Sequence, residues 1–292
     1  MRSAVFFGGG SRLAQEAGYL SGPLKGVVFD AYYGVSAGSI CAAAESFLGT
    51  DQLIAILGEI KDTSDIFATK DITALVGDLA FRSGAGIVMG YKPLRALFAK
   101  YFPAGSKPSK PVTIGRVQNN TMKLQHVTAM PDGTFHTDDD SLGAVTSLSE
   151  FLDALTCSCL TYPIVDMWVD SNNKYWQDGG FREGGPVVKA ILDGSTELHI
   201  CLTGLFSTNC DFDNTTGGDP VNCLTRTLLG MANQNVVGSV NDAVDDASLS
   251  IFVYQAQGQG SSSVFDQLDI QANIKIGAAV VATPGSQLKL VD

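Results

Sequence analysis

Short apolar runs alternate along the chain with stretches in which apolar side chains recur every three or four positions. The runs are typical of strands and the periodic stretches of helices. Strands are expected over residues 3–7, 26–33, 122–130, 196–204 and 248–256. Helices are expected over residues 12–21, 51–60, 91–102, 186–192 and 221–244, and within 265–282. This alternation predicts an α/β fold, a three-layer sandwich with a mostly parallel central sheet and helices on both faces.

Two further helices have a predicted boundary. The segment 34–50 turns sharply into an alanine-rich helix, which Gly49 is expected to end. Ser147 and Glu150 form the Ser-x-x-Glu pattern of a capping box, so a helix should begin near Ser147. Residues 61–90 give only weak signals, and we expect helices and loops there.

The length of 292 residues, 45% of them hydrophobic and 17% charged, fits a globular protein with a large core. Because no internal repeat or linker divides the sequence, we expect one domain over residues 1–292. Its core motifs fall in 4–190, and further strands and helices fall in 196–285.

Charge and the length of apolar runs argue against several classes of protein. The net charge of −11 argues against a nucleic-acid partner. No apolar run approaches the roughly 20 residues that span a bilayer, and the first apolar stretch is too short for a signal peptide. We therefore expect a cytoplasmic protein, or export without a signal peptide. The six cysteines stand in apolar contexts that indicate free buried thiols. Their spacing is poor for zinc, and no metal or other cofactor is expected.

A serine nucleophile is the strongest chemical signal. Gly34-Val35-Ser36-Ala37-Gly38 fits the Gly-x-Ser-x-Gly pattern and lies between an expected strand and an expected helix. This context is typical of a nucleophile elbow, in which glycines at Gly34 and Gly38 permit a sharp turn that exposes the serine oxygen. The alternative is an ordinary turn bounded by glycines.

A triple glycine, Gly8-Gly9-Gly10, follows the first expected strand. Such a loop could cradle a phosphate, make a plain turn, or direct N–H groups toward an oxygen that becomes negative during a reaction. The Gly-x-Gly-x-x-Gly pattern of dinucleotide binding fails here, because Leu13 stands at its last position.

The base for such a serine is not evident among the three histidines. His126 and His199 lie in strand-like runs, and His136 lies in an acidic loop. Only His199 follows Asp178, as a Ser–Asp–His order requires, so a triad esterase that uses His199 is one alternative. Asp178 is followed by two glycines, which leave its carboxylate room to approach another group, although an Asp-Gly turn is common.

Taken together and in order, these motifs resemble the patatin-like phospholipase family. The resemblance rests on the glycine-rich loop with a basic residue, the Gly-x-Ser-x-Gly elbow, and the Asp-Gly-Gly motif with a proline after it. These correspond here to Gly8–Arg12, Gly34–Gly38, Asp178-Gly179-Gly180 and Pro186. The resemblance covers most of the chain and is weakest at 61–88 and 205–220.

The resemblance implies a catalytic dyad with Ser36 as nucleophile and Asp178 as general base. It also implies an oxyanion hole in the loop Gly8, Gly9, Gly10, Ser11 and Arg12. The implied reaction is hydrolysis of a lipid or phospholipid ester through an acyl-serine intermediate. Two positions depart from the family pattern. Leu13 stands where a glycine is usual, and the segment 181–185 has no asparagine ahead of the proline.

The partners expected from this reading are a lipid substrate, a transient membrane surface, and a homo-oligomer or activating protein. Residues 91–110 carry five lysines and arginines among aromatic side chains, with no acidic residue. This composition suits a lipid headgroup region, although a core-packed amphipathic helix with solvated charges is the simpler interpretation. A catalytically silent scaffold with the same fold is the remaining alternative.

Overall fold

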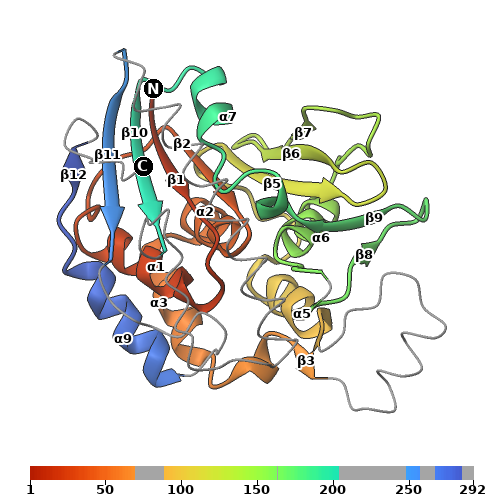
Figure 1. Cartoon of the computed structure of the whole chain (residues 1–292), viewed down its shortest axis with the longest axis horizontal. Helices are drawn as coiled ribbons and strands as arrows, with labels where there is room; N and C mark the ends of the chain where they lie inside the picture. Colours follow the sequence, from red (N-terminus) through yellow and green to blue (C-terminus); the bar gives the residue numbers. More distant parts are fainter. Residues whose placement is uncertain (70–88, 163, 204–247, 257–266, 285–292) are drawn as a thin grey trace, which may run out of the picture.

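The computed structural model describes residues 1–69, 89–162, 164–203, 248–256 and 267–284. At its centre lies one sheet with the strand order β12-β11-β10-β1-β2-β5-β6-β7 (Figure 1). Its parallel strands are β1 (Arg2–Phe6), β2 (Ala31–Val35), β5 (Val112–Gln118), β10 (Glu197–Leu202) and β11 (Ser250–Gln255).

Antiparallel strands extend this parallel centre. They are β6 (Lys123–Ala129) and β7 (Phe135–Thr137) at one edge, β12 (Thr283–Pro284) at the other, and β9 (Tyr175–Asp178) with β8 (Trp168–Val169) against β5. A separate pair is formed by β3 (Ala68–Thr69) and β4 (Met89–Gly90).

Helices lie on both faces of the sheet (Figure 1). They are α1 (Leu13–Ser21), α2 (Ala37–Leu48), α3 (Thr50–Glu59), α5 (Lys92–Tyr101), α6 (Leu148–Ser158), α7 (Val187–Leu192) and α9 (Gln267–Ala278). Short 3₁₀ turns occupy Gly10–Arg12, Thr63–Asp65 and Gly179–Phe181.

Strand β1 shows how the two faces are filled. Ala4 and Phe6 point into the larger core, which α1, α2 and α9 cover, whereas Val5 belongs to the core beneath α7. All three side chains are fully buried. A strand buried on both faces reads as a continuous apolar run, which is what residues 4–7 show. The predicted fold, a mostly parallel sheet covered on both faces, is confirmed.

Several boundaries match the sequence pattern. Gly49 ends α2 with a φ of 85°, and the hydroxyl of Ser147 caps α6 by accepting from the N–H of Glu150. The strand expected over 26–33 is wrong in its first half, because Gly26 adopts a φ of 80° and β2 begins only at Ala31. The helix expected over 221–244 lies outside the described residues.

Strand β5 was not predicted, yet it determines where the chemistry lies. Its polar residues and Gly115 hide the apolar pattern of a buried strand. On one edge of β5, Val35 at the end of β2 pairs with Gly115, and Asp178 at the end of β9 pairs with Arg116. Because these partners are consecutive on β5, the ends of β2 and β9 meet there.

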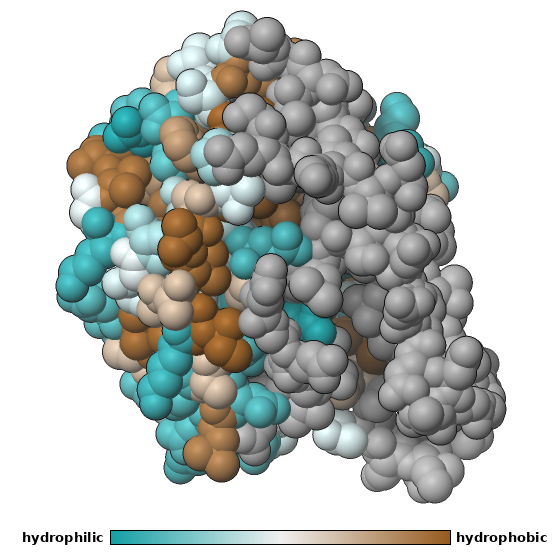
Figure 2. Space-filling model, turned by 60° about the vertical axis from the view of Figure 1, so that its left-hand side comes forward, coloured by the Kyte–Doolittle hydropathy of each residue, from teal (hydrophilic) through white to brown (hydrophobic). Residues whose placement is uncertain are grey.

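The outer surface is mixed in character. Figure 2 views the molecule from the side that carries β11, β12 and α9, and hydrophobic and hydrophilic residues are interspersed over its described part. Leu268 and Val281, on or near α9, are each at least four-fifths exposed. None of the helices that the structure describes is long and apolar enough to cross a bilayer.

Candidate active site

Ser36 stands in the sharp turn between β2 and α2, with a φ of 54° and a ψ of −135°. Residues other than glycine rarely adopt a positive φ, and such strain is often found at functional sites. A Cβ on Gly34 would lie 2.4 Å from the carbonyl oxygen of Gly38, and a Cβ on Gly38 would lie 2.5 Å from that of Phe6. The segment therefore has the strand–turn–helix geometry of a nucleophile elbow and needs both glycines.

The carboxylate of Asp178 accepts a hydrogen bond from Ser36 Oγ at Oδ2, over 2.6 Å. The side chain of Asp178 lies at the end of β9, and the residue is only 5% exposed. Burial raises the pKa of Asp178 to about 6, against the hydrogen bonds from Ser36, the Gly180 N–H and the Thr161 hydroxyl. A carboxylate with a pKa near neutrality can take up a proton and return it during one reaction cycle.

The two carboxylate oxygens of Asp178 have separate partners. Oδ1 accepts from the N–H of Gly180 over 2.7 Å, and Oδ2 accepts from Thr161 Oγ1 over 3.2 Å. A Cβ on Gly179 would lie 2.4 Å from the carbonyl oxygen of Gly115, so only glycine lets this turn pack on β5. The Asp-Gly-Gly motif thus brings the carboxylate to Ser36 and fixes its orientation.

The backbone of Ser36 is held by the end of α6, which the sequence did not indicate. Its N–H donates to Ser158 Oγ over 3.0 Å, and that hydroxyl donates to the carbonyl oxygen of Gly115 over 2.6 Å. Its carbonyl oxygen accepts from Ser39 Oγ over 2.5 Å and from Cys159 Sγ over 3.3 Å. The small polar residues at 156–161 were the only signal for this contact.

The glycine loop lies directly against the serine. A Cβ on Gly8 would come within 2.5 Å of Ser36 Cβ and 3.0 Å of its Oγ. Gly10 has a φ of 59°, which favours glycine, and it begins the 3₁₀ turn that leads through Ser11 to Arg12. The structure therefore brings Gly8 and Ser36 into contact, as a loop facing the nucleophile would require.

Thr203, which sequence reasoning missed, anchors that loop. Its hydroxyl donates to the carbonyl oxygen of Gly8 over 2.6 Å, and its own carbonyl oxygen accepts from Arg12 Nη1 over 3.4 Å. A Cβ on Gly9 would lie 2.0 Å from Thr203 Oγ1. The guanidinium of Arg12 is therefore engaged with the loop's own support.

The histidine alternative for the base has no geometric support. The ring of His199 interacts through Nδ1 with Tyr254 Oη over 2.8 Å and through Nε2 with Glu197 Oε1 over 2.9 Å. It also stacks on Phe252 with ring centroids 4.9 Å apart. Both nitrogens are thus occupied by side chains of β10 and β11, whereas the described partner of Ser36 Oγ is Asp178.

The other buried histidine, His126, lies between two carboxylates. Its Nδ1 is 2.7 Å from Asp138 Oδ2, and its Nε2 is 2.7 Å from Glu183 Oε2. Because the ring stands between the carboxylates, the three side chains do not converge on one point. Within the described ranges, no group of three or more His, Cys, Asp and Glu side chains could hold a metal ion.

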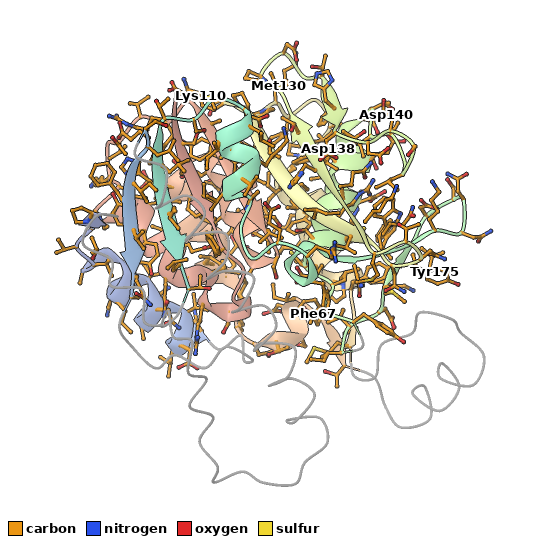
Figure 3. The ribbon with its side chains drawn as sticks, turned by 45° about the horizontal axis from the view of Figure 1, so that its top comes forward. Phe67, Lys110, Met130, Asp138, Asp140 and Tyr175 are labelled. Carbon is orange, nitrogen blue, oxygen red and sulfur yellow. The ribbon has the colours of Figure 1, made fainter. Side chains whose placement is uncertain are left out.

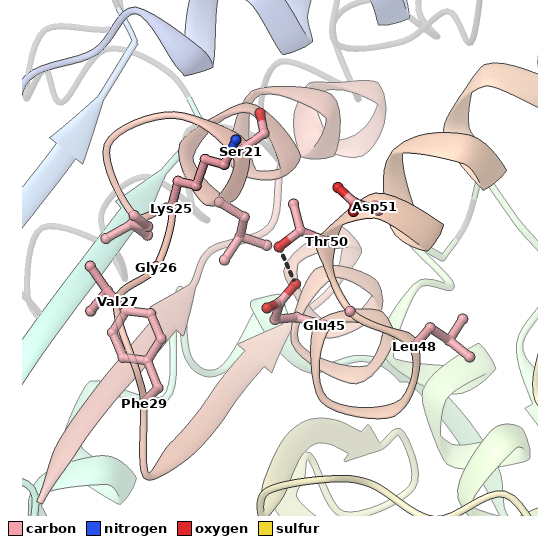
Figure 4. Close-up of a pocket in the computed structure, with 12 residues that line it drawn as sticks. Ser21, Lys25, Gly26, Val27, Phe29, Glu45, Leu48, Thr50 and Asp51 are labelled. Carbon is pink, nitrogen blue, oxygen red and sulfur yellow. Dashed lines mark hydrogen bonds between the residues drawn. The ribbon is translucent and has the colours of Figure 1, made fainter.

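A hollow of about 350 Å³ is lined by residues at the C-terminal end of α2 and the start of α3 (Figure 4), at the opposite end of α2 from Ser36. Its wall includes Glu45, whose carboxylate accepts from Thr50 Oγ1 over 2.8 Å, and Lys25. At ~1.5 Å per residue, Glu45, nine residues after Ser36, lies about 14 Å along α2 from the serine. Ser21, also in the wall, donates its hydroxyl to the Gly18 carbonyl. Because of this distance along α2, the hollow is separate from the Ser36–Asp178 pair.

The basic and aromatic segment 91–110 forms α5 and the loop after it. Leu94 and Phe98 are buried in the main core, so the apolar face of α5 is used for packing. Arg95 pairs with Asp153 over 2.6 Å, and Lys100 pairs with Glu59 over 2.8 Å. The burial of Leu94 and Phe98 agrees with a core-packed helix, and two of its basic side chains are ion-paired rather than free in solvent.

Comparison with known proteins bears on the same residues. The model of the patatin-like phospholipase family matches residues 4–191, a range that includes Ser36 and Asp178. Among solved structures, VipD from Legionella pneumophila is similar with a TM-score of 0.39 and 10% sequence identity. That similarity covers 95% of this chain and 65% of VipD, so the chain spans less than two thirds of that protein. No curated protein matched the sequence.

Proposed function

Because the chain belongs to the patatin-like phospholipase family, we propose that it hydrolyses acyl esters of lipids with Ser36 as nucleophile and Asp178 as general base. The observation that carries this proposal is the 2.6 Å hydrogen bond from Ser36 Oγ to a buried carboxylate. A hydroxyl is a weak nucleophile until a neighbouring base accepts its proton. The proposed dyad supplies that base without a histidine.

In the first half of the reaction, Ser36 Oγ attacks the acyl carbonyl carbon and its proton passes to Asp178 Oδ2. The carbonyl π electrons move to the oxygen, which gives a tetrahedral oxyanion. When the ester C–O bond breaks, the electron pair leaves with the alcohol oxygen. Asp178 returns the proton to that oxygen, and an acyl-serine remains.

In the second half, a water molecule attacks the acyl-serine and gives its proton to Asp178. Collapse of the second oxyanion breaks the bond to Ser36 Oγ, which takes the proton back from Asp178 as the fatty acid departs. A pKa of about 6 supports both roles, because the carboxylate is ionised at neutral pH and can still hold a proton transiently.

The glycine loop is proposed as the oxyanion hole. Gly8 contacts the side chain of Ser36, and within the described part of the chain the N–H groups of Gly9 and Gly10 donate no hydrogen bond. Donors held in place before reaction can stabilise an oxyanion by about 3 kcal/mol each. The N-terminus of α2 adds a favourable dipole at the same point.

The proposed substrates are phospholipids, lysophospholipids or other lipid esters, taken from a membrane surface with transient contact. This class is supported by the family match. A homo-oligomer or an activating partner stays a prediction. Cytoplasmic placement likewise stays a prediction from the sequence.

The decisive experiment compares the wild-type protein with Ser36→Ala on vesicles of mixed phospholipids, with released fatty acid measured by mass spectrometry. The wild-type protein should release fatty acid and Ser36→Ala should not, while Ser106→Ala, in the loop before β5, serves as a matched control. A fluorophosphonate probe should label the wild-type protein at Ser36. Absence of both turnover and labelling would favour the silent scaffold instead.

A further inference from the structure

The side chains of Asp138, His126 and Glu183, of which only the last two are buried, form a row that the proposed reaction does not use. His126 lies on β6, Asp138 follows β7 beside that hairpin (Figure 3), and Glu183 follows the turn after Asp178. The side chains of His126 and Glu183 are each 10% exposed, and that of Asp138 is 35% exposed. Both ring nitrogens are hydrogen-bonded over 2.7 Å.

His126, in the middle of the row, lies across strand β5 from the proposed dyad. His126 pairs with Gly115 across β5, and the next residue of β5 pairs with Asp178 on the opposite edge. The N–H of Glu183 donates to the carbonyl oxygen of Gly179 over 3.1 Å, so the turn that starts at Asp178 closes at Glu183. The carboxylate of Glu183 then fastens the end of that turn to the ring of His126.

A purely stabilising role explains this row poorly. Taking charged groups out of water is costly, and apolar side chains of similar volume often give equal stability. What the hydrogen bonds of this row do supply is a fixed geometry. Here the row fixes the position of Glu183, which lies in the segment that lacks the family's usual asparagine.

Resting on the proposed hydrolase function, we propose that His126 is a positioning residue, which ties Glu183 to Asp138 and so holds the Asp178 turn against Ser36. Asp138 and Glu183 are the charged groups that face the ring, and Lys189 of α7 acts on Asp138 from farther away. On β5, Arg116 hydrogen-bonds Gln125 rather than the ring. Protonated His126 donates from both nitrogens, and neutral His126 donates from only one.

This arrangement connects the row to pH. Burial disfavours the charged ring, but hydrogen bonds and attraction from Asp138 and Glu183 outweigh it and raise the pKa of His126 to about 9. Above that pH the neutral ring has one N–H for two carboxylates, so one of its two hydrogen bonds is lost. Turnover should therefore rise through pH 6 as Asp178 ionises and fall near pH 9 as His126 loses its proton.

The test compares wild type, His126→Gln and Glu183→Gln on a chromogenic short-chain aryl ester between pH 5 and pH 10. For both variants we expect kcat to fall at least tenfold, KM to stay within twofold, and the fall near pH 9 to disappear. His136→Gln, in the neighbouring exposed strand, is the matched control and should keep both the rise in turnover near pH 6 and the fall near pH 9. A His126→Gln protein that keeps its kcat and the wild-type pH profile would overturn the proposal. A loss of kcat that is fully explained by a smaller folded fraction would also overturn it.

A second readout separates this proposal from the hydrolase proposal. The carboxyl ¹³C signal of Asp178 is titrated by NMR in the folded wild-type and His126→Gln proteins. A loosened turn changes both the burial of Asp178 and its hydrogen bonds, so its midpoint should move by at least one pH unit from the wild-type value in the variant. An unchanged midpoint overturns the positioning role. If the wild-type protein neither turns over ester nor reacts with a fluorophosphonate, the hydrolase proposal fails while this readout still decides the positioning role.

Discussion

Ser36 and Asp178 are 142 residues apart in the sequence, yet the serine hydroxyl donates to the aspartate carboxylate over 2.6 Å. Strand β5 brings about this contact, because β2 and β9 end on its same edge opposite Gly115 and Arg116. A serine and a carboxylate held by neighbouring strands need no loop closure to reach hydrogen-bonding distance. The proposed dyad therefore exists before any substrate is bound.

Asp178→Asn should lower turnover about a thousandfold, because the proposed general base is lost. The same change should stabilise the fold above pH 6. An aspartate side chain ordinarily has a pKa of 3.8, whereas that of Asp178 in the folded protein is about 6. As the pH rises from 3.8 to 6, the buried carboxylate ionises at a cost and the stability of the fold decreases. A neutral side chain avoids this cost, which is about 3 kcal/mol at pH 7.

Urea unfolding at pH 4 and pH 7 measures this effect. The advantage of Asp178→Asn should be present at pH 7 and absent below pH 4. Asp140→Asn, at an exposed position, controls for the loss of one negative charge. Equal stability of wild type and Asp178→Asn at pH 7 would contradict the buried ionised carboxylate.

Ser36→Gly and Ser36→Ala both remove the hydroxyl, and both should abolish turnover. They differ in backbone strain, since only glycine adopts a φ of 54° and a ψ of −135° readily. Strain of this kind costs about 1–3 kcal/mol, while glycine also loses more entropy on folding. Ser36→Gly should therefore be the more stable by about 1 kcal/mol in thermal or urea unfolding. If Ser36→Ala is the more stable, the turn is not strained.

The local features of the site could be predicted from the sequence. Gly34, Ser36 and Gly38 are close in the chain, and their spacing alone indicates a sharp turn between a strand and a helix. Asp178 with its two glycines was likewise visible. In each case the informative residues lie within a few positions of one another, so a short window contains the whole signal.

The surroundings of the site could not be predicted, because they depend on contacts between distant segments. Strand β5 contains Gly115 and the buried Arg116, whose guanidinium stacks 3.8 Å from the Trp176 ring. These residues break the apolar run by which a central strand is recognised. Ser158 and Thr203 support the elbow and the glycine loop only after the sheet has formed.

Gly8→Ala should reduce turnover roughly a hundredfold, because the added methyl would lie 2.5 Å from Ser36 Cβ and would displace the glycine loop or the serine. Gly58→Ala is the matched control. Gly58 lies inside α3, where a Cβ meets nothing closer than 3.7 Å, so alanine there should leave turnover unchanged and slightly stabilise the helix. Equal turnover of Gly8→Ala and wild type would contradict a role for this loop.

His199→Gln should keep the chemical step within about twofold, because both ring nitrogens of His199 interact with Tyr254 and Glu197 rather than with the serine. Single-turnover release of the alcohol from an aryl ester measures that step directly. Unfolding by urea checks that the variant is folded, since the ring is buried and stacked. Loss of the chemical step in a fully folded variant would restore the triad esterase.

Thr161→Val should shift the acid limb of the pH profile upward by about one unit. The hydroxyl of Thr161 donates to Asp178 Oδ2 over 3.2 Å and so favours the ionised carboxylate. Its loss removes about 1.5 kcal/mol from that form, which raises the pKa of Asp178 above its value of about 6. Turnover should then fall most at pH 6 and recover at pH 8. Thr161→Ser keeps the hydroxyl and should keep the wild-type profile, and an unshifted limb in Thr161→Val would show that another group controls it.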